Sequence, residues 1–101
     1  MNTIYGNGLV ANEFKAVDIP EGICIFASGV SNSSEHRLSE FNREYSLLKS
    51  ILNKTDSLVY FSTTRIYDEL FVDTSYAKHK LKMEEFIACS FKHYNIYRVP
   101  Q

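Results

Sequence analysis

A tyrosine and a lysine one helical turn apart are the residues of this 101-residue chain best suited to chemistry. Tyr76 and Lys80 belong to the segment YAKHK, where a helix would place both side chains on one face. A phenol with a pKa of about 10 is a poor acid or base at neutral pH. A neighbouring ammonium group favours the phenolate and lowers that pKa. The pair therefore indicates proton transfer, unless it is a chance coincidence on a surface helix.

A buried strand is predicted just before this pair, and it ends in hydroxyl side chains. The run 58–61 is rich in the β-branched and aromatic residues typical of a sheet interior, and the hydroxyl residues 62–64 follow it. In a parallel sheet, the carboxyl ends of the strands border the crevice where ligands bind. Thr63 could hold a substrate oxygen there, and Lys80 could also donate to the ribose of a bound nucleotide.

The start of the chain predicts a turn that could approach a phosphate. A short strand at residues 3–5 leads into the pattern G-x-G-x-x-A at 6–11, followed by a helix over about 9–17. Glycines allow a tight turn and a close backbone approach to a pyrophosphate, whose charge a helix N-terminus stabilises. The candidate nucleotide-binding residues in this turn are Gly6, Asn7, Gly8 and Leu9. An ordinary strand-to-helix turn is the alternative.

A second turn of small residues follows the apolar run 23–27. Small side chains at a strand end let the backbone come close to a ligand, so Ala27, Ser28 and Gly29 are candidate ligand contacts. The same stretch could simply cap the next helix, predicted over 34–53, and the two interpretations are compatible.

Four β-type runs alternate with three helical segments along the chain. The runs lie near residues 3–6, 23–27, 57–62 and 94–99. This alternation predicts one α/β domain spanning 1–101, a small Rossmann-like three-layer structure with a four-stranded parallel sheet and helices on both faces. The segment 34–53 carries a continuous apolar stripe that would pack on the sheet. The stripe consists of Leu38, Phe41, Tyr45, Leu48 and Leu52.

In this order the elements resemble the core of an extended short-chain dehydrogenase/reductase, most closely the nucleotide-sugar epimerases, dehydratases and reductases. The resemblance rests on VYFST at 59–63 with IYD at 66–68, on SYAKHKLKMEEF at 75–86 and on IYRVP at 96–100. It implies a catalytic Ser/Thr, Tyr and Lys at Thr63, Tyr76 and Lys80, because Thr63 lies four residues before Tyr67. It also implies NAD or NADP as cofactor and a nucleotide-sugar as substrate. The implied cofactor residues are Gly6, Asn7, Gly8, Leu9, Ala27, Ser28, Gly29 and Lys80.

The chain departs from that family in three respects. Thr64 and Arg65 stand where the sugar 4,6-dehydratases carry an acidic pair, which argues against that branch. The second and third strands of the family have no counterpart, so the residue that would distinguish NAD from NADP is not identifiable. Relatives also continue beyond Gln101 into substrate-binding segments. We therefore expect a truncated piece, a degenerate relative or a subunit completed by a partner, and the alternative function is a non-catalytic Rossmann-like binding or assembly module.

Composition excludes several classes of partner. The net charge is −1 with no basic block, so nucleic acid is not an expected partner. Neither a signal-peptide pattern nor an apolar run of membrane-span length is evident, so we expect a cytoplasmic protein. Cys24 and Cys89 are expected to be reduced, and the scattered histidines suggest no metal site. His79 is expected at the surface.

The first prediction concerns association. Without two of the family's strands, the strand near residues 3–6 should lie at or near a sheet edge, where unpaired backbone groups favour self-association. We expect a dimer or higher homo-oligomer. Light scattering of the purified chain at tens of micromolar should give at least twice the mass of one chain, and a monomer mass would contradict the prediction.

Overall fold

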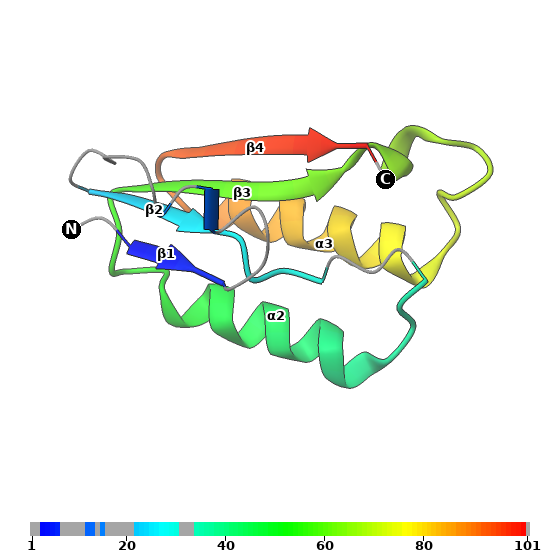
Figure 1. Ribbon diagram of the computed structural model, residues 1–101, viewed down its shortest axis with the longest axis horizontal. Helices are drawn as coiled ribbons and strands as arrows, with labels where there is room; N and C mark the ends of the chain where they lie inside the picture. The colour runs from blue at the N-terminus through cyan, green and yellow to red at the C-terminus, as the bar shows by residue number, and fades with distance from the viewer. Residues whose placement is uncertain (1–2, 7–11, 14, 16–21, 31–33, 101) are drawn as a thin grey trace.

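The computed structural model describes residues 3–6, 12–13, 15, 22–30 and 34–100. Its elements, in chain order, are β1 (Thr3–Tyr5), β2 (Ile23–Phe26), α2 (Leu38–Ser50), β3 (Ser57–Thr63), the 3-10 helix η1 (Thr64–Tyr67), α3 (Ser75–Ser90) and β4 (Tyr94–Val99). The strands form one sheet in the order β1-β2-β3-β4, and every neighbouring pair is parallel (Figure 1). The predicted α/β class, with a small parallel sheet of four strands, is confirmed.

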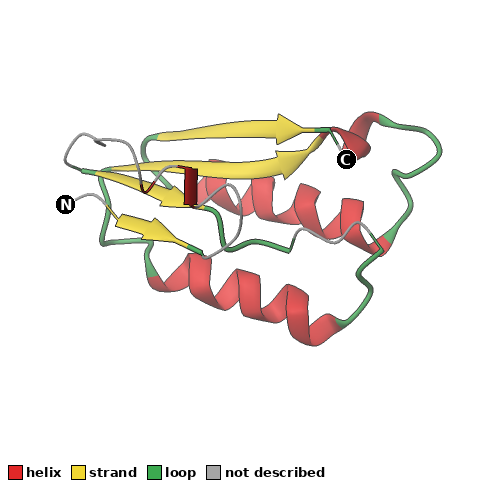
Figure 2. Cartoon of the chain, in the orientation of Figure 1, coloured by secondary structure: helices red, strands yellow, loops and turns green. Residues whose placement is uncertain are grey.

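Helices α2 and α3 lie side by side on one face of this sheet (Figure 2). Alternate residues of the central strands face them, and the buried cluster at this interface contains Cys24, Phe26, Leu48, Ile51, Leu58, Tyr60, Met83, Ile87 and Phe91. The helix expected over 9–17 lies largely outside the described residues, although residues 12, 13 and 15 have helical backbone. Whether a helix covers the face of the sheet opposite α2 and α3 depends on the segment 9–17, so that part of the expectation stays a prediction.

Local hydrogen bonds decide where the two helices begin. Helix α2 starts at Leu38, a turn later than expected, because the Glu35 carboxylate holds the preceding segment. That carboxylate accepts from the backbone N–H groups of His36 and Arg37 and from the Arg37 guanidinium. Helix α3 is capped by Thr74, whose hydroxyl accepts from the N–H of Ala77. Within the described ranges, no helix has both the length and the apolar character needed to cross a bilayer.

The turn after β1 depends on a glycine. Gly6 has a φ of +123°, a conformation that residues with a Cβ rarely adopt. A Cβ at this position would lie 2.4 Å from the carbonyl oxygen of Ala27, which follows β2. The N–H of Ala27 in turn donates to the carbonyl of Tyr5 at 2.8 Å. The ends of β1 and β2 are therefore held together by backbone contacts that leave no room for a side chain.

Substituting this glycine should loosen the β1–β2 pair. Gly6→Ala meets both an unfavourable φ and a backbone carbonyl that cannot move without breaking the ladder, so we expect a loss of about 3 kcal/mol or more in the free energy of unfolding. Gly22 is the matched control, since its φ is also positive, at +86°, but the three atoms nearest to a Cβ there all belong to the side chain of Asp56. Gly22→Ala should cost about 1–2 kcal/mol. Equal losses in urea unfolding would show that the Ala27 contact is unimportant.

Candidate functional site

Tyr76 and Lys80 share one face of α3, as their spacing predicts. Helix α3 connects two parallel strands, so it runs antiparallel to them and its N-terminus lies at the carboxyl edge of the sheet. The Nζ atom of Lys80 lies 5.8 Å from the centre of the Tyr76 ring. Both side chains are buried, with 1% of Tyr76 and 2% of Lys80 exposed. The pair therefore faces the protein interior at the edge where a ligand would approach.

The partner of Lys80 is a carboxylate that the sequence patterns did not single out. Glu44 of α2 has no exposed surface, and both of its oxygens lie 3.2 Å from the Nζ atom of Lys80. Its Oε1 also accepts from the N–H of Val30 and pairs with Nε2 of His79, each at 2.8 Å. Its Oε2 accepts the hydroxyl of Tyr60, and that hydroxyl accepts from Lys80 at 3.2 Å. We call Glu44, Tyr60, His79 and Lys80 the Glu44 cluster.

The protonation states of this cluster follow from burial and from its internal contacts. Burial raises the pKa of Glu44, but the hydrogen bond from His79, the charge of Lys80 and the hydrogen bond from Tyr60 outweigh it and lower that pKa to about 2. Burial raises the pKa of Tyr60 well above its usual range, and the neighbouring Glu44 charge adds to the effect. Burial lowers the pKa of Lys80 against the opposing attraction of Glu44. At neutral pH, Glu44 is thus a carboxylate and Tyr60 a neutral donor.

The predicted ligand-binding turn after β2 lies directly against this cluster. A Cβ on Gly29 would lie 2.7 Å from Nζ of Lys80 and 2.8 Å from Oε2 of Glu44, so only glycine fits without displacing the pair. The carbonyl and hydroxyl of Ser28 lie 2.9 and 3.4 Å from Nη1 of Arg43.

Four of the predicted residues therefore lie at this edge in two contacting pairs. Gly6 contacts Ala27, and Gly29 contacts Lys80. The other three predicted residues of the first turn, Asn7, Gly8 and Leu9, lie outside the described residues.

Thr63 is buried at the end of β3, and its hydroxyl has a local partner. The Oγ1 atom accepts from the N–H of Arg65 at 3.1 Å and caps η1. In the sheet Thr63 pairs with Val99 and has the parity of Phe61, so strand alternation assigns it to the opposite face from Tyr60. A contact between Thr63 and Tyr76 stays a prediction.

Ser62 is the hydroxyl that strand alternation places on the side of Tyr76. Its side chain is 2% exposed, and its Oγ has no hydrogen-bond partner among the described residues. Ser62 lies two residues beyond Tyr60 on the same face, about 6.6 Å closer to the carboxyl edge. On α3, Tyr76 lies about 6 Å beyond Lys80 in the same direction. Lys80 is in contact with Tyr60. Ser62 and Tyr76 therefore lie at a similar distance from the carboxyl edge of the sheet.

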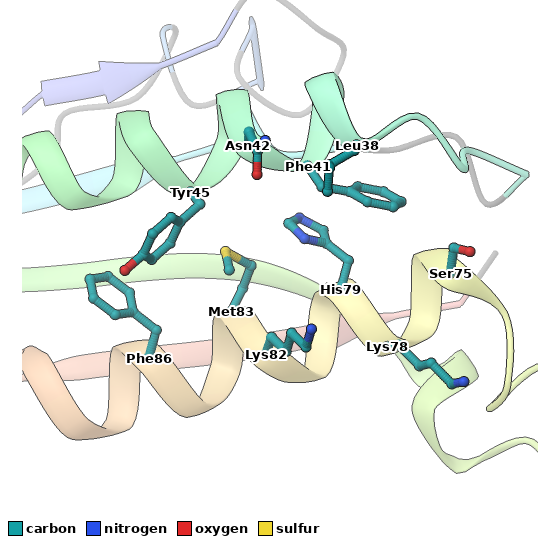
Figure 3. Close-up of a pocket in the computed structure, with 10 residues that line it drawn as sticks. All are labelled: Leu38, Phe41, Asn42, Tyr45, Ser75, Lys78, His79, Lys82, Met83 and Phe86. Atoms are coloured by element: carbon teal, nitrogen blue, oxygen red, sulfur yellow. The ribbon is translucent and has the colours of Figure 1, made fainter.

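A groove between α2 and α3 has one residue of the Glu44 cluster, His79, in its lining. It has a volume of about 540 Å³ and is lined by Leu38, Phe41, Asn42, Tyr45, Ser75, Lys78, His79, Lys82, Met83 and Phe86 (Figure 3). The His79 ring stacks on Phe41 with 4.4 Å between ring centres. Only 6% of His79 is exposed, so the expectation that it lies at the surface was wrong. Neither Tyr76 nor Lys80 lines this groove, which is therefore separate from the predicted ligand edge.

Comparisons with protein-family profiles, with curated proteins and with solved structures find no match to this chain.

A signal for Glu44 was present in the sequence. Glu44 lies three residues after Phe41 and four before Leu48, and is therefore a charged residue on the apolar stripe of its helix. A charge at such a position is costly unless it is paired. That spacing, combined with a lysine on the facing helix, could have indicated the cluster.

The low pKa of Glu44 predicts a specific pH dependence of stability. Because this pKa is lowered from 4.5 to about 2 on folding, the ionised group stabilises the protein above about pH 4.5, and this contribution disappears as the pH falls toward 2. Glu44→Gln leaves the buried Lys80 without a counter-charge, so at pH 7 it should destabilise the protein by about 3–5 kcal/mol. The difference in the free energy of unfolding between the parent and Glu44→Gln should decrease steadily as the pH falls toward about 2.

Urea unfolding of parent and variant at several pH values checks this expectation. Glu40→Gln on the same helix is the control, because Glu40 is half-buried and forms an i,i+3 ion pair with Arg43 near the surface. It should change the free energy of unfolding by less than about 1 kcal/mol. A Glu44→Gln deficit that stays constant with pH would contradict the assigned ionisation.

Proposed function

We propose that this chain forms the core of an NAD(P)-dependent oxidoreductase or epimerase site of the short-chain dehydrogenase/reductase type, acting on a nucleotide-sugar. The observation that carries the proposal is the close approach of the Gly29 turn to Lys80, with Tyr76 one helical turn closer to the carboxyl edge of the sheet. The Gly6 turn meets Ala27 at the same edge. A parallel sheet binds its ligands at this edge.

The residues at the edge fit the approach of a nucleotide. Gly6 and Gly29 are two backbone positions where a Cβ would collide with its neighbours, so the turns present backbone rather than side chains. Lys80 supplies a cation beside Gly29, suited to the hydroxyls of a ribose. When bound, the nicotinamide would supply the hydride chemistry.

The proposed chemistry divides between three side chains. Tyr76 would take up or return the proton of a sugar hydroxyl at its Oη atom, and the carbon that carries this hydroxyl would exchange a hydride with the bound nicotinamide. Lys80 favours the phenolate form of Tyr76 and orients the ribose. Ser62 holds the sugar oxygen, a role for which its unpartnered buried hydroxyl is better placed than Thr63.

One observation favours the alternative, a non-catalytic Rossmann-like assembly module. The Lys80 ammonium group already contacts two carboxylate oxygens and a phenol, and Tyr76 is almost fully buried. A site fixed in this state would have a structural role and would not bind a nucleotide.

Titration of the purified chain with NADH and NADPH, followed by fluorescence, tests the proposal without knowledge of the sugar. We expect saturable binding by the parent and by Tyr76→Phe, and weaker binding by Lys80→Met, with folding of each variant checked by circular dichroism. No binding of either nucleotide by a folded parent would favour the assembly module.

Turnover of a panel of nucleotide-sugars, followed by NADH absorbance, then tests the roles of the side chains. Tyr76→Phe should abolish turnover, and Ser62→Ala should lower kcat by about a hundredfold, in the range of general acid–base effects. Thr63→Val should retain most activity. A larger loss of kcat in Thr63→Val than in Ser62→Ala would instead assign the substrate-orienting role to Thr63.

A further inference from the structure

Glu44 connects four parts of the fold through one carboxylate. It belongs to α2 and contacts Lys80 and His79 on α3, Tyr60 on β3 and the N–H of Val30 after β2. Burying a carboxylate without partners is strongly unfavourable, and these contacts supply both charge compensation and hydrogen bonds.

The contacts leave Lys80 a defined position and orientation. An ammonium group has three N–H donors, and its acceptors here are the two oxygens of Glu44 and the hydroxyl of Tyr60. Tyr60 can accept because it gives its own proton to Glu44. Lys80 Nζ lies at the same distance from both Glu44 oxygens, so a single N–H can be shared between them. One donor can then point elsewhere.

Gly29 lies on a further side of the Lys80 ammonium group. One of its two Cα hydrogens occupies the direction in which a Cβ would touch both Nζ of Lys80 and Oε2 of Glu44. The ammonium is therefore held from α2 and β3 and lies directly against the backbone of the turn after β2. That turn is the segment that the proposed function assigns to the nucleotide.

We propose that Glu44 is the positioning residue of the site, holding the charged Lys80 ammonium beside the Gly29 turn for contact with the ribose of a bound nucleotide. This inference rests on the proposed function. His79 and Tyr60 act through Glu44: each supplies one hydrogen bond that keeps the carboxylate ionised and in place. A purely structural ion pair is the alternative.

The position of Lys80 can be tested without any nucleotide. In protein labelled with 15N-lysine, a buried ammonium held by hydrogen bonds exchanges its protons slowly and gives an observable 1H–15N correlation. Lys80→Arg assigns the signal by its disappearance. We expect the signal in the parent and in Glu40→Gln, and its loss by faster exchange in Glu44→Gln. An unchanged signal in Glu44→Gln would overturn the proposal.

Nucleotide affinity supplies the second measurement. Glu44→Gln should weaken binding of NADH or NADPH by about tenfold, equivalent to about 1.4 kcal/mol. Glu44→Asp keeps the charge on a shorter side chain and should give an intermediate affinity. This variant replaces Glu44→Gln in the comparison if Glu44→Gln folds poorly. Leu48→Ala is the stability control, because this buried residue lies one turn away on α2 and belongs to the apolar cluster.

The outcomes separate the two proposals. Weaker affinity in Glu44→Gln with parental affinity in folded Leu48→Ala supports positioning. Parental affinity in Glu44→Gln, or equal weakening in both variants, overturns it in favour of a structural ion pair. If the parent binds no nucleotide, the proposed function fails, and the ammonium signal alone decides whether Glu44 holds Lys80.

Discussion

The buried ion pair between Glu44 and Lys80 is the contact on which the arrangement of this small domain depends. Two charges removed from water cost several kcal/mol each, and only good geometry with additional hydrogen bonds offsets that cost. Tyr60, His79 and the N–H of Val30 supply those bonds. Because the five groups come from α2, α3, β3 and the turn after β2, correct packing of all four is needed to satisfy one carboxylate.

The same pair links the two functional interpretations. For a catalytic site, a lysine held beside a tyrosine and a glycine turn is preorganised, so little rotamer freedom remains to be lost on binding. For an assembly module, the same contacts simply satisfy the charge of Lys80. The two interpretations differ in whether an N–H donor of Lys80 is available to a ligand on the Gly29 side. Ligand affinity tests this difference, because both interpretations have the same fold.

Several features could be predicted from the sequence because they depend on local periodicity. The parallel sheet follows from apolar β runs separated by helices, and the shared face of Tyr76 and Lys80 follows from four-residue spacing. Glu44 and His79 depend on packing between distant helices, and a charged residue on a helix is normally solvated. Thr63 is predicted because it lies four residues before Tyr67, whereas strand alternation in the folded sheet places its neighbour Ser62 on the side of Tyr76.

The close contact at Gly29 has a consequence for how such a sequence can change. Any side chain at position 29 must displace Nζ of Lys80 or Oε2 of Glu44, and loss of either charge leaves the other buried without a partner. Gly29, Glu44 and Lys80 are therefore expected to vary together among homologous sequences. A homologous chain with a larger residue at position 29 should also lack the acid and the lysine, and a tolerated path between the two states must change all three positions together.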